Sequence, residues 1–124
     1  MINSELRAEI EDLDTAPVEC DGFARLAAKA LHRADVPYRA YVGCASCHKS
    51  GESVEPHFWI VCEDEIIDFR ARMWLGTQAQ HGFLPEAEYG QFYKGKEADI
   101  GILDDVTEAI LKVPMPDMKA LFGK

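Results

Sequence analysis

Two apolar segments separated by a short acidic stretch constrain the fold of this chain most strongly. Residues 57–62 (HFWIVC) and 65–71 (EIIDFRA) are rich in β-branched and aromatic residues, and Glu63-Asp64 lies between them. This pattern predicts two antiparallel strands joined by a tight turn. Because side chains alternate between the two faces of a strand, the number of turn residues decides which side chains share a face.

The length of the turn sets which polar side chains meet. With a two-residue turn, or with a four-residue turn, His57 and Asp68 lie on one face as diagonal neighbours, about 5–8 Å apart at Cβ. A three-residue turn would send Asp68 to the opposite face. The directly opposed pairs in the favourable register are Val61 with Ile66 and Trp59 with Asp68.

Asp68 interrupts an otherwise apolar strand and needs a partner there. A buried carboxylate is costly unless it is hydrogen-bonded or paired with a charge. His57 meets this need in the favourable register, and Arg70 or Arg72 meets it by a salt bridge in the alternative interpretation. His57 likewise has a plain alternative, as a residue that starts a strand after Pro56. A shared face favours the functional interpretation, because two titratable groups are then coupled.

A cysteine stands where a helix is expected to begin. Residues 20–34 carry an apolar stripe at helical spacing and are rich in alanine, which favours the helix. In the first turn, Cys20 faces the positive end of the helix dipole, which favours thiolate over thiol. Its backbone N–H is also placed to stabilise an oxyanion. The plain alternative is a small buried apolar side chain.

The remaining segments complete an α+β fold that we expect to form one domain over residues 1–124. Residues 3–13 predict a short first helix, and residues 38–42 predict a strand. Residues 44–56 are polar and predict an exposed loop. Residues 78–99 predict a mixed loop with a short helix, packed by its aromatic side chains.

A late helix is expected near the end of the chain. Asp104 or Asp105 is placed to cap it, and Pro114 is placed to end it. Three apolar residues at helical spacing are expected to face the core: Val106, Ile110 and Val113. Residues 115–124 allow one more helical turn.

The order of these features resembles that of the transglutaminase-like superfamily, whose members share a papain-like Cys-His-Asp arrangement. The resemblance covers a cysteine at a helix start, a strand, a loop, a His-x-Trp strand and an aspartate on the next strand. The matching residues are Cys20, Phe23, Ala24, Leu26, residues 36–43, His57, Phe58, Trp59, Ile67 and Asp68. It implies a helix carrying the nucleophile packed on a small antiparallel sheet.

By this resemblance, Cys20 is the nucleophile, His57 is the general base and acid, and Asp68 orients the imidazole. The superfamily includes thiol peptidases, glutamine acyltransferases, deamidases and members without catalysis. We therefore expect acyl transfer or hydrolysis at an amide bond of a protein or peptide, without a cofactor. A non-catalytic interaction module of the same fold is the alternative. Substrate contacts are expected from three residues: Trp59, Arg70 and Trp74.

The charge balance argues against two classes of partner. The 124 residues contain 13 Lys and Arg against 22 Asp and Glu, a net charge of −9. Nucleic acids and anionic membrane surfaces both need a basic face on the protein. No apolar run is long enough to span a bilayer, and residues 1–7 lack the basic start and apolar stretch of a signal peptide. We therefore expect a cytoplasmic protein whose four cysteines do not form a disulfide framework.

Residues 44–48 (CASCH) form a second cysteine pattern that competes with the dispersed set. The pattern fits c-type haem attachment and half of a zinc site. Haem attachment needs an export route, which residues 1–7 do not indicate. A redox-active cysteine pair is a further alternative. A zinc site would combine Cys44, Cys47 and His48 with Cys62 or His57.

Two other histidines compete with His57 for the role of the base. His81 is the main alternative, although no carboxylate in an apolar strand stands near it in the sequence. His32 falls on the predicted helix among basic neighbours and is expected to be solvated.

Overall fold

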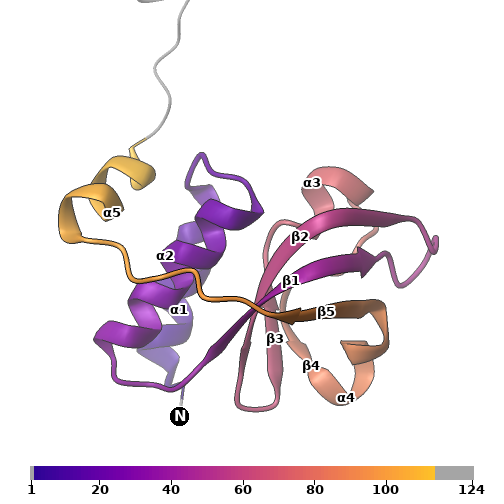
Figure 1. Ribbon diagram of the computed structural model, residues 1–124, viewed down its shortest axis with the longest axis horizontal. Coiled ribbons are helices and arrows are strands. Elements are labelled where there is room, and N and C mark those ends of the chain that lie inside the picture. Colours follow the sequence, from indigo (N-terminus) through magenta and orange to yellow (C-terminus); the bar gives the residue numbers. More distant parts are fainter. Residues whose placement is uncertain (1, 114–124) are drawn as a thin grey trace, which may run out of the picture.

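A computed structural model describes residues 2–113 and shows an α+β fold around a five-stranded antiparallel sheet (Figure 1). The strands are Arg39–Ser46 (β1), Ser53–Cys62 (β2), Glu65–Asp68 (β3), Gly82–Pro85 (β4) and Tyr93–Glu97 (β5). They lie side by side in the order β4-β3-β2-β1-β5. Strands β1 to β4 therefore follow one another across the sheet, and β5 returns to pair with β1.

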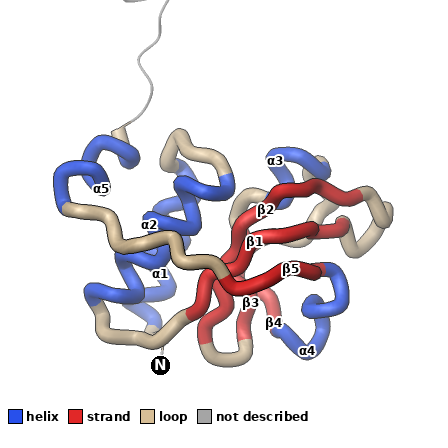
Figure 2. Tube along the Cα trace, in the orientation of Figure 1, coloured by secondary structure: helices blue, strands red, loops and turns tan. Residues whose placement is uncertain are grey.

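The longer helices gather on one side of the molecule, and the longest of them, Cys20–Arg33, packs on the sheet (Figure 2). The helices are Ser4–Asp12 (α1), Cys20–Arg33 (α2), Ala71–Leu75 (α3), Glu86–Tyr89 (α4) and Asp105–Lys112 (α5). Figure 2 shows α1, α2 and α5 gathered beside one end of the sheet, with α3 and α4 near the other. None of the helices within residues 2–113 is long and apolar enough to cross a membrane. The further helical turn predicted over residues 115–124 lies outside the described residues.

Side-chain caps explain where two of these helices begin. Asn3 Oδ1 accepts a 2.8 Å hydrogen bond from Leu6 N, and Asp104 Oδ1 accepts one of 2.7 Å from Thr107 N. Each cap satisfies an N–H group that has no partner inside the helix. The predicted start of the late helix is therefore confirmed at Asp104. Helix α2 differs, because it begins at Cys20 without a side-chain cap.

Apolar side chains form a core on each face of the sheet. On one face, the predicted stripe of α2 packs on β1, β2 and β3, and the cluster includes Phe23, Leu26, Leu31, Ala40, Ile60 and Ile67. The cluster on the other face contains Ala45, Trp59, Val61, Ile66, Leu84 and Tyr93. Burying one large aliphatic side chain contributes roughly 1.5–3 kcal/mol, so packing on the sheet fixes the position of α2.

The hairpin of β2 and β3 has the two-residue turn on which the predicted site depends. Val61 pairs with Ile66, and Glu63 and Asp64 form the turn. Glu63 has a φ of 56°, within the left-handed region that the tightest hairpin turns use. The predicted register is confirmed.

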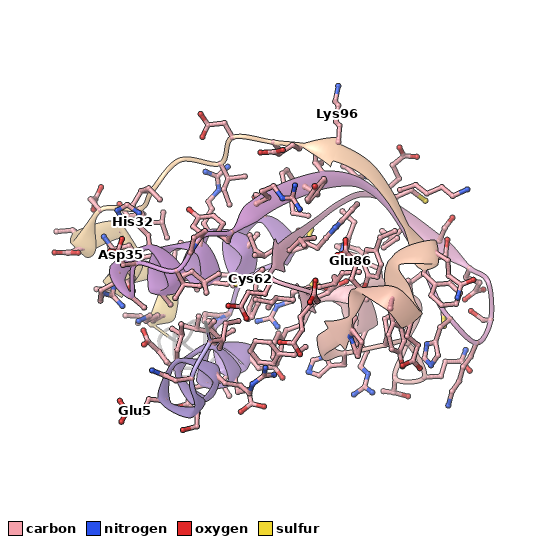
Figure 3. All side chains as sticks on the ribbon, turned by 90° about the horizontal axis from the view of Figure 1, so that it is seen from below. Glu5, His32, Asp35, Cys62, Glu86 and Lys96 are labelled. Atoms are coloured by element: carbon pink, nitrogen blue, oxygen red, sulfur yellow. The ribbon has the colours of Figure 1, made fainter. Side chains whose placement is uncertain are left out.

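Two segments predicted as loops contain strands. Both ends of residues 44–56 belong to the sheet, because β1 extends to Ser46 and β2 begins at Ser53. Residues 78–99 hold β4 and β5. The sequence of β5 (YKGKE) lacks the apolar pattern of a strand, because β5 is an exposed edge strand. Lys96 on this strand points away from the body of the molecule (Figure 3). Lysines on an edge strand protect it from pairing with other chains.

Helix α5 presents a different face to the core from the one predicted. Val106, Ile110 and Val113 are 70%, 64% and 60% exposed, so their predicted burial is wrong. Glu108 is buried instead, because Arg33 of α2 binds its two carboxylate oxygens at 2.6 and 2.7 Å. Both contacts come from one nitrogen of the guanidinium, Arg33 Nη2, and these charge-assisted hydrogen bonds hold α5 against α2.

Candidate active site

Cys20 is the first residue of α2, and only 9% of it is exposed. The preceding residue, Glu19, makes no capping hydrogen bond through its side chain. Gly22 allows the segment before the helix to approach closely, because a Cβ at this position would lie 2.7 Å from Cβ of Val18. Within the first turn, Gly22 N donates a 2.8 Å hydrogen bond to Asp21 Oδ1, so this N–H group is used by Asp21 and not by a side chain before the helix.

His57 and Asp68 form a buried pair on neighbouring strands. His57 Nε2 lies 2.9 Å from Asp68 Oδ2, and the two residues are 0% and 2% exposed. A carboxylate only accepts hydrogen bonds, so Nε2 carries the proton that it donates. The pairing that the hairpin register predicted is therefore present.

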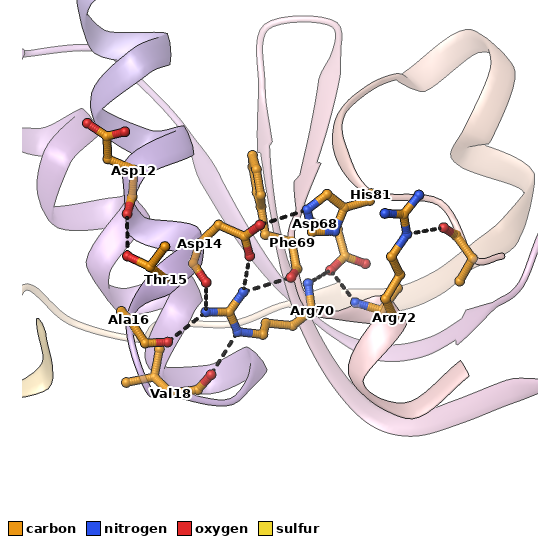
Figure 4. A network of polar contacts seen from close by, with 12 residues as sticks. Asp12, Asp14, Thr15, Ala16, Val18, Asp68, Phe69, Arg70, Arg72 and His81 are labelled. Atoms are coloured by element: carbon orange, nitrogen blue, oxygen red, sulfur yellow. Dashed lines mark hydrogen bonds and ion pairs between the residues drawn. The ribbon is translucent and has the colours of Figure 1, made fainter. Parts of the chain in front are cut away.

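The other oxygen of Asp68 binds the backbone where α3 begins (Figure 4). Asp68 Oδ1 accepts hydrogen bonds from Arg70 N at 3.0 Å and Ala71 N at 3.1 Å. Both oxygens of the carboxylate are therefore used, one on the imidazole and one on the backbone. The side chain cannot rotate without breaking bonds on both sides.

Tyr93 on β5 is a member of this network that sequence reasoning missed. Its hydroxyl donates a 2.6 Å hydrogen bond to Asp68 Oδ2, and Gln80 Nε2 donates to the hydroxyl at 3.2 Å. Burial raises the pKa of Tyr93, and the negative charge of Asp68 adds to the effect. Tyr93 therefore stays protonated and remains a donor. Nothing in the sequence around Tyr93 indicates that it donates a hydrogen bond to Asp68, because the pattern of its segment predicts a loop with a short helix.

The pKa values of the pair move in opposite directions. Burial lowers the pKa of His57, but the hydrogen bond with Asp68, the nearby Cys20 sulfur and the charges of both groups outweigh it and raise the value from 6.5 to about 9. Burial raises the pKa of Asp68, but hydrogen bonds from His57, Tyr93 and the backbone of Arg70 outweigh it and lower the value. The pair is therefore an imidazolium–carboxylate pair at neutral pH.

Cys20 lies near the imidazole of His57. Its sulfur stabilises the imidazolium and contributes to the raised pKa of His57. His57 Nδ1 is buried and makes no hydrogen bond of standard geometry within residues 2–113. Buried polar atoms are nearly always hydrogen-bonded, so the absence of a partner for His57 Nδ1 is unusual. In unliganded enzymes, catalytic hydrogen bonds are often long and tighten when the substrate binds.

Cys20 opens onto a surface cleft of about 480 Å³. The cleft is lined by Glu19, Cys20, Asp21, Val54, Glu55, Pro56, Phe58 and Trp74. Trp74, on α3, is 53% exposed and forms an aromatic wall of the cleft. Its location is compatible with the predicted contact to a substrate.

Trp59, the second predicted substrate contact, lies inside the protein. It is 4% exposed and packs against Tyr41, Tyr93 and the ring of His57. Gly95 makes room for the indole, because a Cβ there would collide with the carbonyl oxygen of Val42 and lie 2.8 Å from Trp59 Cη2. Trp59 therefore packs against the imidazole inside the protein. The prediction that it touches a substrate is corrected.

Arg70, the third predicted contact, is also committed elsewhere (Figure 4). Its guanidinium donates to the carbonyls of Asp14, Ala16, Val18 and Phe69 and to the carboxylate of Asp14, at distances between 2.7 and 3.1 Å. A guanidinium has five N–H donors, and all are used. Arg70 therefore holds the segment before α2 against the end of β3, and the prediction that it binds a substrate is corrected.

The CASCH segment does not gather into a metal centre. Cys47 is buried, and the Ser50 side chain together with a 3.5 Å hydrogen bond from Ser50 N to the sulfur lowers the pKa of its thiol. His48 Nδ1 lies 3.1 Å from Gln80 Oε1. Across residues 2–113, no group of three or more His, Cys, Asp and Glu side chains is arranged to hold a metal ion. The geometry thus gives no support to zinc at Cys44, Cys47 and His48.

The other histidines lie outside the cleft that Cys20 lines. His81 Nε2 is 3.0 Å from Asp14 Oδ2, and its ring packs edge-on against Phe69 (Figure 4). His81 therefore has a carboxylate partner of its own. His32 is exposed near the C-terminal end of α2 (Figure 3). Of the histidines described, His57 is the one whose pKa the cysteine at position 20 raises.

Comparison of the chain with protein-family models, with curated proteins and with solved structures gives no significant match.

Proposed function

We propose that this protein is a thiol-dependent enzyme that hydrolyses or transfers acyl groups at amide bonds, as a cysteine peptidase, amidase or deamidase does. The fold proposed for it is a papain- or transglutaminase-like core. The observation that carries the proposal is the 2.9 Å bond of His57 Nε2 to Asp68 near Cys20, which leaves Nδ1 of the same ring without a partner within residues 2–113. A nucleophile, a base and an orienting carboxylate are the three parts that such catalysis needs.

In the acylation step, the Cys20 thiolate attacks the carbonyl carbon of the amide. An S–C bond forms, and the carbonyl electron pair moves to oxygen, where the backbone N–H of Cys20 stabilises the negative charge. The C–N bond then breaks, and the proton on His57 Nδ1 passes to the departing amine. The products of this step are a thioester on Cys20, a free amine and a neutral imidazole.

In the deacylation step, His57 takes a proton from water while the water oxygen attacks the thioester carbon. The C–S bond breaks, the carboxylic acid product leaves, and Cys20 and His57 return to their starting charges. An amine in place of water gives transamidation. Hydrolysis is favoured because the cleft of about 480 Å³ is open to solvent.

Asp68 and Tyr93 are proposed to act through His57. The raised pKa of about 9 keeps the imidazole protonated at neutral pH, so the proton needed by the leaving amine is in place before the substrate binds. The charge of the imidazolium also favours the thiolate form of a neighbouring cysteine. The open shape of the cleft suits a protein or peptide substrate, with Trp74 as a surface on which a side chain packs.

Alkylation by iodoacetamide, mapped by mass spectrometry, tests the activated thiol. At about pH 6, where an ordinary thiol is almost fully protonated, Cys20 is expected to react at least about tenfold faster than Cys44. The His57→Gln and Asp68→Asn variants should lose this preference. His32→Gln is the matched control, because His32 is exposed and remote from the cleft. Equal reactivity of Cys20 in the wild-type protein and in His57→Gln would contradict the proposal.

Turnover is tested with a mixed peptide library followed by mass spectrometry. Hydrolysis adds water across a peptide bond, deamidation replaces a side-chain amide nitrogen with oxygen, and transamidation joins two peptides with loss of ammonia. Each product should disappear in Cys20→Ser. A reactive Cys20 without any turnover of amides would favour the alternative of a non-catalytic interaction module.

A further inference from the structure

The cleft at Cys20 is lined by negative charge. Glu19 and Asp21 flank the cysteine in sequence, and Glu55 faces them from β2. These three carboxylates are exposed and form no ion pair within residues 2–113. No Lys, Arg or His side chain is among the residues that line the cleft in the described part of the chain.

This charge is not a simple result of the net charge of −9. Glu19 also borders a second cleft, of about 440 Å³, on the other side of the segment before α2. That second cleft contains Arg70, Arg72 and His81 together with Asp14. The two clefts that share Glu19 therefore differ in charge. The cleft with Cys20 is lined by acidic residues alone among its charged groups, and the second cleft also has basic ones.

The apolar walls of the Cys20 cleft fit the stem of a long basic side chain. Trp74, Phe58, Val54 and Pro56 provide aromatic and aliphatic surface beside the carboxylates. Lysine and arginine bury their methylene groups on such surfaces while the charged end stays near acceptors. An exposed tryptophan is also the best aromatic partner for a cation.

The thiol in this cleft lies near a buried polar atom that has no partner within residues 2–113. His57 is 0% exposed, its Nδ1 makes no hydrogen bond within these residues, and Cys20 contributes to the raised pKa of the imidazole. Under the proposed function the reacting amide lies beside this thiol, and Glu19, Asp21 and Glu55 line the same cleft. A cationic group on the substrate therefore has acceptors within the cleft.

We propose that the Cys20 cleft selects peptides that carry a lysine or arginine close to the reacting amide. This inference rests on the proposed function for its chemistry, but the charge preference can be measured on the thiol alone. An acidic residue at the same place would meet three carboxylates and no basic side chain among the described residues that line the cleft. Clefts lined by one sign of charge raise the association rates of oppositely charged ligands by about 10- to 1,000-fold.

Two thiol reagents of opposite charge provide the test: 2-(trimethylammonium)ethyl methanethiosulfonate and 2-sulfonatoethyl methanethiosulfonate. Each forms a mixed disulfide with a cysteine thiolate and releases methanesulfinate. We expect the cationic reagent to modify Cys20 at least about tenfold faster than the anionic one at low salt. Cys44 provides an internal comparison, because it lies opposite Lys94 in the sheet and should show no preference for the cation.

Variants locate the origin of the preference. Glu19→Gln, Asp21→Asn and Glu55→Gln should each lower the cation-to-anion rate ratio by roughly 1.5- to 5-fold, as expected for single exposed charges. Glu88→Gln is the matched control, because it removes one charge from the exposed surface of α4, away from the cleft. Raising the salt concentration to about 0.5 M should reduce the ratio as well, since the Debye length falls to a few ångströms.

The outcomes separate this inference from the proposed function. A ratio near one at Cys20, with alkylation that still depends on His57, overturns the charge preference and leaves the proposed function standing. A ratio that falls equally in Glu88→Gln also overturns it, because net charge then explains the effect. In the peptide library, amides beside Lys or Arg should be turned over at least about tenfold faster than the same amides beside Asp or Glu. The reverse order overturns the inference.

Discussion

The hydroxyl of Tyr93 donates a 2.6 Å hydrogen bond to Asp68 Oδ2, the carboxylate oxygen that also accepts from His57. The last strand of the sheet is thereby tied to the candidate site. The bond also contributes to the lowered pKa of Asp68, after the effects of burial and of His57.

Tyr93→Phe should raise the pKa of Asp68, because the carboxylate loses one donor while staying buried. The acid limb of the pH profile for Cys20 alkylation should therefore move to higher pH. Unfolding by urea should show a loss of about 1–2 kcal/mol, as expected for one buried hydrogen bond. Tyr41→Phe is the control, since Tyr41 stacks on Trp59 but its hydroxyl makes no hydrogen bond within the described residues. An unchanged acid limb in Tyr93→Phe would show that the hydroxyl does not act on Asp68.

His57 should make stability depend on pH in the neutral to alkaline range. Its pKa is raised in the folded protein, from 6.5 to about 9, so the folded state holds the proton more tightly than the unfolded state. This contribution is fully present below the unfolded pKa of 6.5 and is lost as the pH rises through about 9. A tenfold difference in proton affinity between the two states corresponds to about 1.4 kcal/mol of stability.

The measurement is the free energy of unfolding at several pH values between about 6 and 10, around the ordinary histidine pKa. The wild-type protein should lose stability across this range, and His57→Gln should show a weaker dependence. His32→Gln should follow the wild-type curve, because His32 is exposed. Parallel curves for the wild-type protein and His57→Gln would be inconsistent with a raised pKa at this residue.

Arg70→Met should destabilise the protein by about 3–5 kcal/mol, the range seen when one partner of a buried charge pair is removed. Four backbone carbonyls and Asp14 would lose their donor. Arg70→Lys should recover only part of this loss, because an ammonium has three donors and no planar fork. Arg72→Lys is the control, since its Nε makes one hydrogen bond, to Ala79 O. Urea unfolding measures all three, and full stability in Arg70→Lys would contradict a structural role.

Gly95→Ala should disturb the site from a distance. The added Cβ would collide with the carbonyl of Val42 and with Trp59, which packs beneath His57. Overpacking of this kind costs typically about 1–3 kcal/mol. Gly90→Ala is the matched control, because its Cβ would meet only Glu86 Cγ at an ordinary 3.6 Å. The melting temperature should fall in Gly95→Ala and not in Gly90→Ala. Equal melting temperatures would show that β1 and β5 can move apart to accept the added Cβ.

The sequence was most informative where a local rule fixes the geometry. Strand alternation and a two-residue turn were sufficient to bring His57 and Asp68 together, and both are visible in one short stretch of the chain. The apolar stripe likewise located α2, with Cys20 at its start. These predictions needed no knowledge of the rest of the chain.

The sequence was least informative where position depends on long-range pairing. Tyr93 belongs to an exposed edge strand whose lysines and glycine resemble a loop, and only its pairing with Ala45 brings it to the site. Arg70 looked available because it follows the strand that carries Asp68, but its partners lie more than fifty residues earlier. Val106 and Ile110 had the spacing of a core stripe, but Glu108 lies on the buried side of α5, where it pairs with Arg33, and the two apolar side chains are exposed.

The connection made by Arg70 has a consequence for the order in which a growing chain acquires reactivity. Its guanidinium joins residues separated by 52 to 56 positions, and Tyr93 reaches Asp68 across a further 25. During synthesis from the N-terminus, Cys20 is therefore made long before Asp68, which raises the pKa of His57, and before Arg70 and Tyr93, which hold Asp68 and the segment before α2 in place. The thiol of a partly made chain has no His57 beside it until the sheet has formed. Under the proposed function, the preferential alkylation of Cys20 at acidic pH therefore requires the folded sheet, and an unfinished chain should not show it.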